Sequence, residues 1–118
     1  MKFRKEGVHS VVMDLRRNGG GSLAEAISLT GLFIPTGPVV QRRDFRRRIT
    51  LAGDDDPSVT WDRPVVIMIS KFSASAAEIF AGAIQDYRRG IIIGDRRTHG
   101  KGTVQTVADL GKYTSFLG

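Results

Sequence analysis

The stretch PVVIMISKFSASAAEIFAGAIQDY, residues 64–87, decides the fold. It opens with an apolar run at 64–70, which is typical of a buried strand. A loop of small residues follows and ends in Ser75-Ala76-Ala77-Glu78, which has the Ser-x-x-Glu form of a helix capping box. Apolar residues then recur at helical spacing as far as Tyr87, and Gly90 ends the pattern. The stretch therefore predicts a strand, a loop and a helix.

The same pattern occurs on the N-terminal side of this unit. The run at 8–15 is rich in β-branched residues and predicts a second strand, which ends at the glycine loop Asn18-Gly19-Gly20-Gly21. Ser22-Leu23-Ala24-Glu25 is another capping box, and Pro35 ends the apolar helical pattern that follows.

The remaining segments complete the pattern. We expect a third buried strand at Ile91–Ile93, a polar loop at 95–102 and a fourth strand at Thr103–Val107. The polar segment 37–60 predicts a hairpin, with short strands near Val39–Gln41 and Arg48–Leu51. Apolar strands that alternate with helices indicate an α/β fold with a mostly parallel sheet and flanking helices.

Composition limits the possible function. The chain has 118 residues, a net charge of +6 and no Cys, so thiolate catalysis and Cys-ligated zinc are excluded. It contains no apolar run long enough to cross a membrane and no secretion signal, and no spacing of His, Asp and Glu indicates a metal site. We therefore expect no metal, no cofactor and no integral membrane segment.

The basic charge has a local explanation. Five arginines lie between residues 42 and 48, with Phe45 as the only aromatic residue among them. A base-stacking surface needs more aromatic residues, so a solvated hairpin is favoured over a phosphate-binding or nucleic-acid-binding patch.

Three loops follow predicted strands and could carry chemistry: residues 18–21, 71–76 and 98–102. The first could present backbone amides to an oxyanion or to a phosphate. Residues 19–24 also fit the dinucleotide fingerprint G-x-G-x-x-A, with Asp44 near the distance expected for a ribose contact. A nucleotide-binding or acyl-CoA-binding module that uses Gly19–Gly21 is therefore an alternative, and a simple glycine turn is another.

The other two loops offer a nucleophile and a base. Ser75 could attack a carbonyl from the helix N-terminus, or it could only cap the helix. Lys101 lies between two glycines and could act as a general base if burial favoured its neutral form, or it could be a surface lysine. Ser75, His99 and Asp86 also allow a Ser-His-Asp triad to be drawn.

Taken together, the three loops resemble a known family. The stretches NGGG, SASAAEIFAGAIQDY and GDRRTHGKGTVQ occur in the order and near the spacing of the carboxy-terminal processing proteases, also called tail-specific proteases. The resemblance runs from about Val11 to about Gln105. It implies a ClpP/crotonase-like core and an endopeptidase that cleaves peptide bonds with a serine–lysine dyad.

The resemblance also implies roles for individual residues. Ser75 matches the nucleophile and Lys101 the general base. The oxyanion hole would be formed by the amides of Gly19 or Gly20 and of Ala76, and a third polar residue would be Gln105 or Asp86, with Glu78 as a weaker candidate.

The resemblance further implies substrates and a setting for the chain. The substrates would be proteins or peptides with flexible apolar C-termini rather than nucleic acid, and the full-length protein would be periplasmic or otherwise exported. The chain lacks the family's PDZ segment, so we expect residues 1–118 to be a truncated fragment of the catalytic domain with little activity alone.

Overall fold

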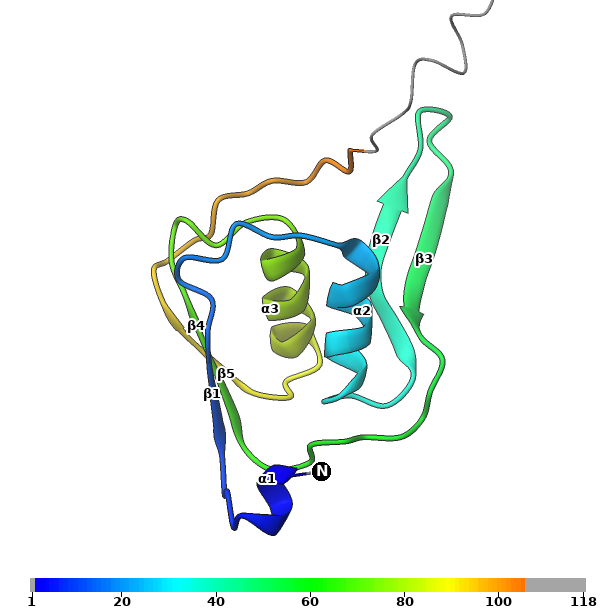
Figure 1. Cartoon of the computed structure of the whole chain (residues 1–118). Coiled ribbons are helices and arrows are strands. Elements are labelled where there is room, and N and C mark those ends of the chain that lie inside the picture. The colour runs from blue at the N-terminus through cyan, green and yellow to red at the C-terminus, as the bar shows by residue number, and fades with distance from the viewer. Residues whose placement is uncertain (1, 106–118) are drawn as a thin grey trace, which may run out of the picture.

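The computed structural model describes residues 2–105 of the chain. These residues form three helices and five strands, which Figure 1 labels. In chain order the elements are α1 (Lys2–Lys5), β1 (Val11–Asp14), α2 (Leu23–Gly31), β2 (Gly37–Arg43), β3 (Ile49–Asp54), β4 (Val65–Ile69), α3 (Ala76–Asp86) and β5 (Ile91–Gly94).

A parallel sheet organises the molecule. The strand order is β1-β4-β5, with Val11 opposite Val65 and Ile69 opposite Gly94. Helices α2 and α3 each follow a strand of this sheet and run back towards the end of the sheet where that strand begins. The carboxyl ends of the three strands therefore lie at one edge (Figure 1). The prediction of an α/β fold with a mostly parallel sheet and flanking helices is confirmed.

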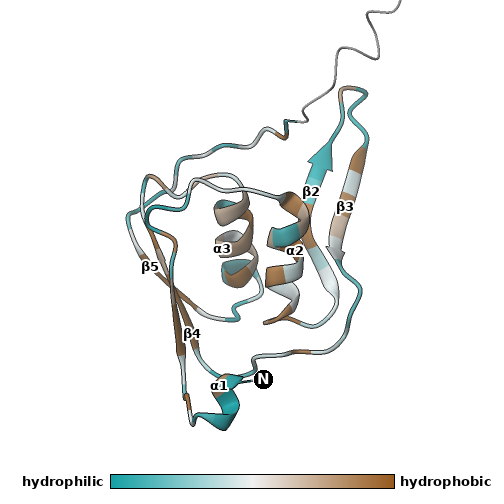
Figure 2. Cartoon of the chain, viewed as in Figure 1, coloured by the Kyte–Doolittle hydropathy of each residue, from teal (hydrophilic) through white to brown (hydrophobic). Residues whose placement is uncertain are grey.

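The core lies between this sheet and the two longer helices. Ile67 of β4 is fully buried, and Phe80 and Ile84 of α3 pack in the same cluster. Phe33, just after α2, contacts Phe80 with 5.7 Å between ring centroids, which joins the two helices. Figure 2 shows that apolar residues concentrate on β4 and on the facing parts of α2 and α3.

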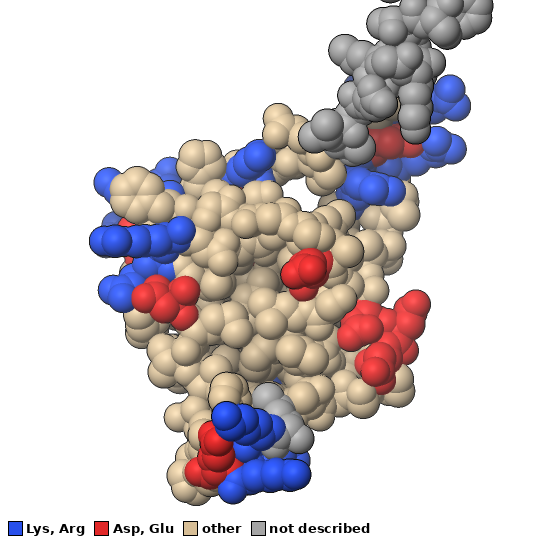
Figure 3. All heavy atoms as spheres, in the orientation of Figure 1, with Lys and Arg blue, Asp and Glu red and all other residues tan. Residues whose placement is uncertain are grey.

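The polar segment after α2 forms the predicted hairpin, with both strands longer than expected. β2 and β3 pair antiparallel, and Asp44 organises their turn by accepting the N–H groups of Arg46 and Arg48 at 2.8 and 2.9 Å. Figure 3 shows the resulting cluster of basic side chains at the hairpin tip. The arginine-rich stretch is therefore the polar end of a hairpin.

One strand prediction was wrong. Thr103–Gln105 have no strand structure, and Val104 is exposed. The reason is that a strand needs a hydrogen-bonding neighbour, whereas this segment leaves the edge of the sheet and runs towards the hairpin (Figure 1). Thr106 and Val107, the rest of that prediction, lie outside the described residues.

Residues 2–105 contain neither a membrane-spanning helix nor a cluster of metal-binding side chains. None of the helices there is long and apolar enough to cross a membrane. Within the same range no group of three His, Cys, Asp or Glu residues could hold a metal ion.

Candidate active site

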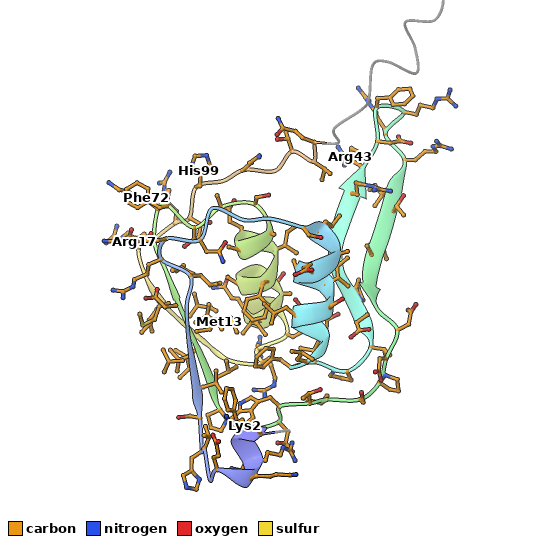
Figure 4. The ribbon with its side chains drawn as sticks, in the orientation of Figure 1. Lys2, Met13, Arg17, Arg43, Phe72 and His99 are labelled. Atoms are coloured by element: carbon orange, nitrogen blue, oxygen red, sulfur yellow. The ribbon has the colours of Figure 1, made fainter. Side chains whose placement is uncertain are left out.

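The three predicted loops meet at one edge of the sheet. Figure 4 labels three residues at this edge: Phe72 from the second loop, His99 from the third, and Arg17, which directly precedes the first. Backbone hydrogen bonds tie the loops together, since the Ala74 N–H donates to the Asn18 carbonyl at 3.0 Å and the His99 N–H donates to the Ser73 carbonyl at 3.0 Å. The glycine loop, the serine loop and the lysine loop therefore form one assembly.

Ser73 joins the ends of β1 and β4, just before the first two loops. This side chain is fully buried, and its hydroxyl donates to the Leu15 carbonyl at 2.7 Å. The same oxygen accepts the Ser70 N–H at 2.9 Å. No sequence pattern predicted this role, and the only available signal was a polar residue among small residues directly after a buried strand.

Ser75 has a strained backbone. Its φ of 55° and ψ of −119° lie in a region that non-glycine residues rarely adopt. The residue is half-buried at the N-terminus of α3, where the chain turns sharply from β4 into a helix. Strained strand-to-helix turns of this kind present the nucleophilic serine in the α/β-hydrolases.

The start of α3 carries one half of the predicted capping box, because Glu78 binds the N-cap N–H while the Ser75 hydroxyl makes no cap hydrogen bond. The Glu78 carboxylate accepts the Ser75 N–H at 2.7 Å. The Glu78 N–H finds an acceptor in the Ser75 carbonyl oxygen at 2.9 Å. The Ser75 hydroxyl is therefore not required to satisfy the first turn of the helix, which keeps it available for chemistry.

Gly20 lies directly against Ser75. Its φ is +102°, and a Cβ built on it would lie 2.6 Å from the Ser75 Cβ and 3.0 Å from the Ala76 nitrogen. Only glycine lets the two backbones approach so closely. The structure thus brings together Gly20, Ser75 and Ala76, as the sequence analysis expected for an oxyanion hole.

The backbone amides near Ser75 differ in whether they already have a hydrogen-bond partner. The Gly20 N–H donates to the Asn18 side-chain oxygen at 2.9 Å. Ala76 is the first residue of α3, where a backbone N–H has no partner within the helix. An oxyanion at Ser75 would meet the N-terminal dipole of α3 in addition to such amides.

Glu78 connects α3 with the lysine loop. Besides the Ser75 N–H, its carboxylate accepts the Thr98 hydroxyl at 2.6 Å, the Gly100 N–H at 2.6 Å and the Lys101 N–H at 3.0 Å. Burial raises the pKa of Glu78, but these hydrogen bonds outweigh it and hold the pKa below its usual value. From the sequence, Glu78 is predicted as part of a helix cap and as a weaker candidate for the third polar residue.

The other residues predicted for the site are Lys101, His99, Gln105 and Asp86. Lys101 is attached to the start of α3 through its backbone, and its side chain is exposed rather than buried. His99 and Gln105 are also exposed, with Gln105 at the end of the described range. Asp86 is the last residue of α3, about 16 Å along the helix axis from Ser75, so the structure does not bring these two together.

Asp44, which the dinucleotide fingerprint would place at a ribose, instead forms part of the turn between β2 and β3. Its carboxylate accepts the Arg48 Nε at 2.9 Å in the hairpin turn. It therefore does not serve the glycine loop in the way the dinucleotide fingerprint requires.

An ion pair flanks the glycine loop. Arg16 donates to both carboxylate oxygens of Asp14, at 2.9 and 2.8 Å, and lowers the pKa of Asp14 to about 2. Both side chains are exposed, so the pair contributes little to stability and keeps the end of β1 charged.

Comparison with known proteins identifies the family of this site. Residues 1–117 match peptidase family S41. The tail-specific protease of Haemophilus influenzae is 53% identical over 110 residues, which cover 93% of this chain and 16% of that protein. The chloroplastic C-terminal processing peptidase of Tetradesmus obliquus is 37% identical over 109 residues, which cover 92% of this chain and 23% of that protein.

A solved structure has the same fold. The photosystem II D1 C-terminal processing protease superposes with a TM-score of 0.75 at 35% sequence identity, over 94% of this chain and 28% of that one. The chain thus spans between 16% and 28% of the length of these proteins. Because the match covers nearly all of it, including the three loops of the site, the chain belongs to peptidase family S41.

Proposed function

We propose that this chain forms part of the catalytic domain of a serine endopeptidase in which Ser75 is the nucleophile and Lys101 the general base. The observation that carries the proposal is the strained backbone of Ser75 at the N-terminus of α3, with Gly20 packed directly against it. The Lys101 backbone is joined to the same helix turn through Glu78. Relatives named as tail-specific and C-terminal processing proteases support the assignment.

The mechanism is acyl transfer. Neutral Lys101 accepts the proton of the Ser75 hydroxyl, and the serine oxygen attacks the peptide carbonyl. Backbone amides at Gly19 or Gly20 and at Ala76 stabilise the oxyanion, assisted by the dipole of α3. Lys101 then protonates the leaving amine, and water releases the acyl group from Ser75.

The exposure of Lys101 sets a condition on this mechanism. A lysine acts as a base only when its charged form is disfavoured, which requires removal from water. In the described residues the side chain is exposed, so a bound substrate or further parts of the polypeptide supply the cover. Activity of the isolated chain is accordingly low.

The proposal also covers the substrate class, the cellular location of the full-length protein and the third polar residue of the site. We expect the substrates to be proteins with flexible apolar C-termini and the full-length protein to be exported. Relatives named as tail-specific and carboxy-terminal-processing proteases support action on protein C-termini, and the Gram-negative source of the first supports export. Gln105, four residues after Lys101, is the preferred partner of the lysine, and Asp86 keeps only the support of its position in the sequence.

A fluorophosphonate probe tests the dyad. Ser75 displaces fluoride from phosphorus only if its hydroxyl is activated, so we expect mass spectrometry to find the adduct on Ser75 of the full-length protein. Ser75→Ala abolishes labelling, and Lys101→Ala slows it at least about 100-fold. The matched controls Ser28→Ala on α2 and Lys5→Ala on α1, both exposed, keep the original rate. Equal labelling of Lys101→Ala and the unaltered chain would refute the dyad.

A further inference from the structure

Asn18 lies in the glycine loop but takes no part in acyl transfer. It is the only asparagine among the 118 residues, and Gly19 follows it directly. The backbone nitrogen after an asparagine can attack the side-chain amide, and glycine carries no side chain that would obstruct this attack. The pair Asn18-Gly19 therefore permits a spontaneous modification of the loop that packs against Ser75.

Both reacting residues are open to solvent. Asn18 and Gly19 are exposed, and together with Arg16 and Arg17 they line an open cavity of about 850 Å³ at the edge of the sheet. Figure 4 shows Arg17, the residue before Asn18, on the outside of the molecule. Water therefore reaches the reacting atoms, and a small leaving group such as ammonia can escape.

The Gly19 nitrogen is the nucleophile of this reaction. Within residues 2–105 no group accepts the Gly19 N–H, whereas the N–H groups on either side are held, by the Leu15 carbonyl at 3.0 Å and by the Asn18 Oδ1 at 2.9 Å. Loss of the Gly19 proton thus breaks no hydrogen bond. A Cβ built on Gly19 would meet nothing within 4 Å beyond its chain neighbours, so the loop also has room to rearrange.

The Asn18 side chain is held near that nitrogen. The hydrogen bond from the Gly20 N–H to Asn18 Oδ1 closes a small ring of atoms that contains both the Asn18 Cγ and the Gly19 nitrogen. The same bond draws electron density from the side-chain carbonyl and so favours attack at Cγ. Arg17 lines the same cavity, and its positive charge favours the negative charge that develops on Oδ1 during the attack.

We propose that Asn18 is a site of self-modification and that its conversion to isoaspartate inactivates the neighbouring catalytic site. The Gly19 nitrogen bonds to the Asn18 Cγ, the bond from Cγ to the side-chain NH₂ breaks, and ammonia leaves with the proton that Gly19 gave up. Water then opens the cyclic imide to aspartate or to isoaspartate. Nothing is oxidised or reduced, and water is the only co-reactant.

Isoaspartate changes both hydrogen bonds that hold the loop at this residue. Cγ becomes part of the main chain, so its oxygen is no longer the side-chain acceptor of the Gly20 N–H. The original carbonyl, which accepts the Ala74 N–H at 3.0 Å, becomes a free carboxylate.

These changes reach the nucleophile through Gly20. The main chain before Gly19 gains a CH₂ group, which displaces Gly20 from its close packing on Ser75. Either product also places a negative charge beside the amides proposed for the oxyanion, and this charge opposes the oxyanion. The inactivation, but not the modification itself, rests on the proposed function.

Ageing of the full-length protein tests the proposal. The protein is held in mildly alkaline buffer, sampled over time and cleaved after glutamate in weakly acidic buffer, which yields a peptide of residues 7–25 with Asn18 as its only side-chain amide. Conversion replaces NH₂ by OH and adds about 1 Da to this peptide. An isoaspartyl methyltransferase marks the isoaspartate product. We expect the fraction of Ser75 that a fluorophosphonate labels to fall in step with unmodified Asn18.

Gly19→Ala and Gly21→Ala form a matched pair. A Cβ at either position would meet nothing within 4 Å beyond its chain neighbours, but only the first lies on the residue whose nitrogen attacks. Gly19→Ala should therefore slow both the conversion and the loss of labelling at least about 10-fold. Gly21→Ala should age at the original rate.

The outcomes separate the two proposals. If Asn18 stays intact in the folded protein while a synthetic peptide of residues 14–22 converts in the same buffer, the loop protects Asn18 and the self-modification is refuted. Conversion with undiminished labelling of Ser75 would refute the inactivation. If freshly prepared protein is not labelled at Ser75 at all, the proposed function is wrong, and the mass of the peptide 7–25 still decides whether Asn18 modifies itself.

Discussion

The Glu78 carboxylate accepts the backbone N–H of Lys101 at 3.0 Å while it holds the N–H of Ser75 at 2.7 Å. One side chain thus joins the residues that we propose as base and nucleophile, although 26 positions separate them in the sequence. The position of Lys101 is fixed through its backbone, so its side chain remains free to move to the serine.

Replacement of Glu78 should release the lysine loop. In Glu78→Gln one carboxylate oxygen becomes an NH₂ group, which cannot accept the N–H groups that now face it, and we expect a loss of about 1–3 kcal/mol in stability. Hydrogen exchange should speed up at Gly100 and Lys101, and fluorophosphonate labelling of Ser75 should slow. Glu25→Gln, the same change in the first turn of α2, is the control; normal exchange at both amides in Glu78→Gln would refute the connection.

The lowered pKa of the Glu78 carboxylate makes the stability of the chain depend on pH. The pKa of Glu78 in the folded chain lies below its ordinary value of 4.5, so the unfolded chain binds more protons between the two values. Its contribution to stability is complete above about pH 4.5 and is lost as the pH falls through the lower, folded pKa. The difference in Tm between the unaltered chain and Glu78→Gln should therefore be constant near neutrality and shrink below pH 4.5. A difference that grew in acid would contradict the assignment.

Ser73 should contribute to stability rather than to chemistry. Ser73→Ala removes the hydroxyl that satisfies the Leu15 carbonyl and the Ser70 N–H in a fully buried position, which should cost about 1–3 kcal/mol. Urea unfolding measures this loss. Ser28→Ala, at an exposed position on α2, should cost less than about 0.5 kcal/mol. Equal midpoints for the two variants would show that the buried hydrogen bonds are not needed.

The elements of the fold were predictable where local patterns are strong. Apolar runs at 64–70 and 91–93 became adjacent parallel strands, and the capping boxes at Ser22 and Ser75 lie where helices begin. The strand expected at Thr103–Gln105 failed because pairing depends on a neighbour, which a local pattern does not reveal.

The site was predictable only in part, for a related reason. Loops after parallel strands must meet at one edge, so the approach of the glycine, serine and lysine loops followed from the fold. The hydrogen bonds of Glu78 and Ser73 depend on tertiary geometry and left no pattern at fixed spacing. The hydrogen bond that occupies the Gly20 N–H likewise depends on the rotamer of Asn18.

Gly20 supplies the sharpest test of the close approach between the loops. In Gly20→Ala the new Cβ would lie 2.6 Å from the Ser75 Cβ and 2.8 Å from the Ala74 carbonyl oxygen, at a φ of +102° that alanine rarely adopts. The backbone at one of the two loops must therefore move, at a cost of about 1–3 kcal/mol.

A displacement of about 1 Å at the nucleophile should slow labelling of Ser75 about 100-fold. Gly19→Ala is the matched control, because a Cβ there meets nothing within 4 Å and its φ is not in the left-handed region. If Gly19→Ala slowed labelling as much as Gly20→Ala does while both variants stayed folded, loop flexibility rather than the contact with Ser75 would explain the glycines. If only Gly20→Ala is impaired, the close packing of Gly20 on Ser75 is what the reactive serine requires.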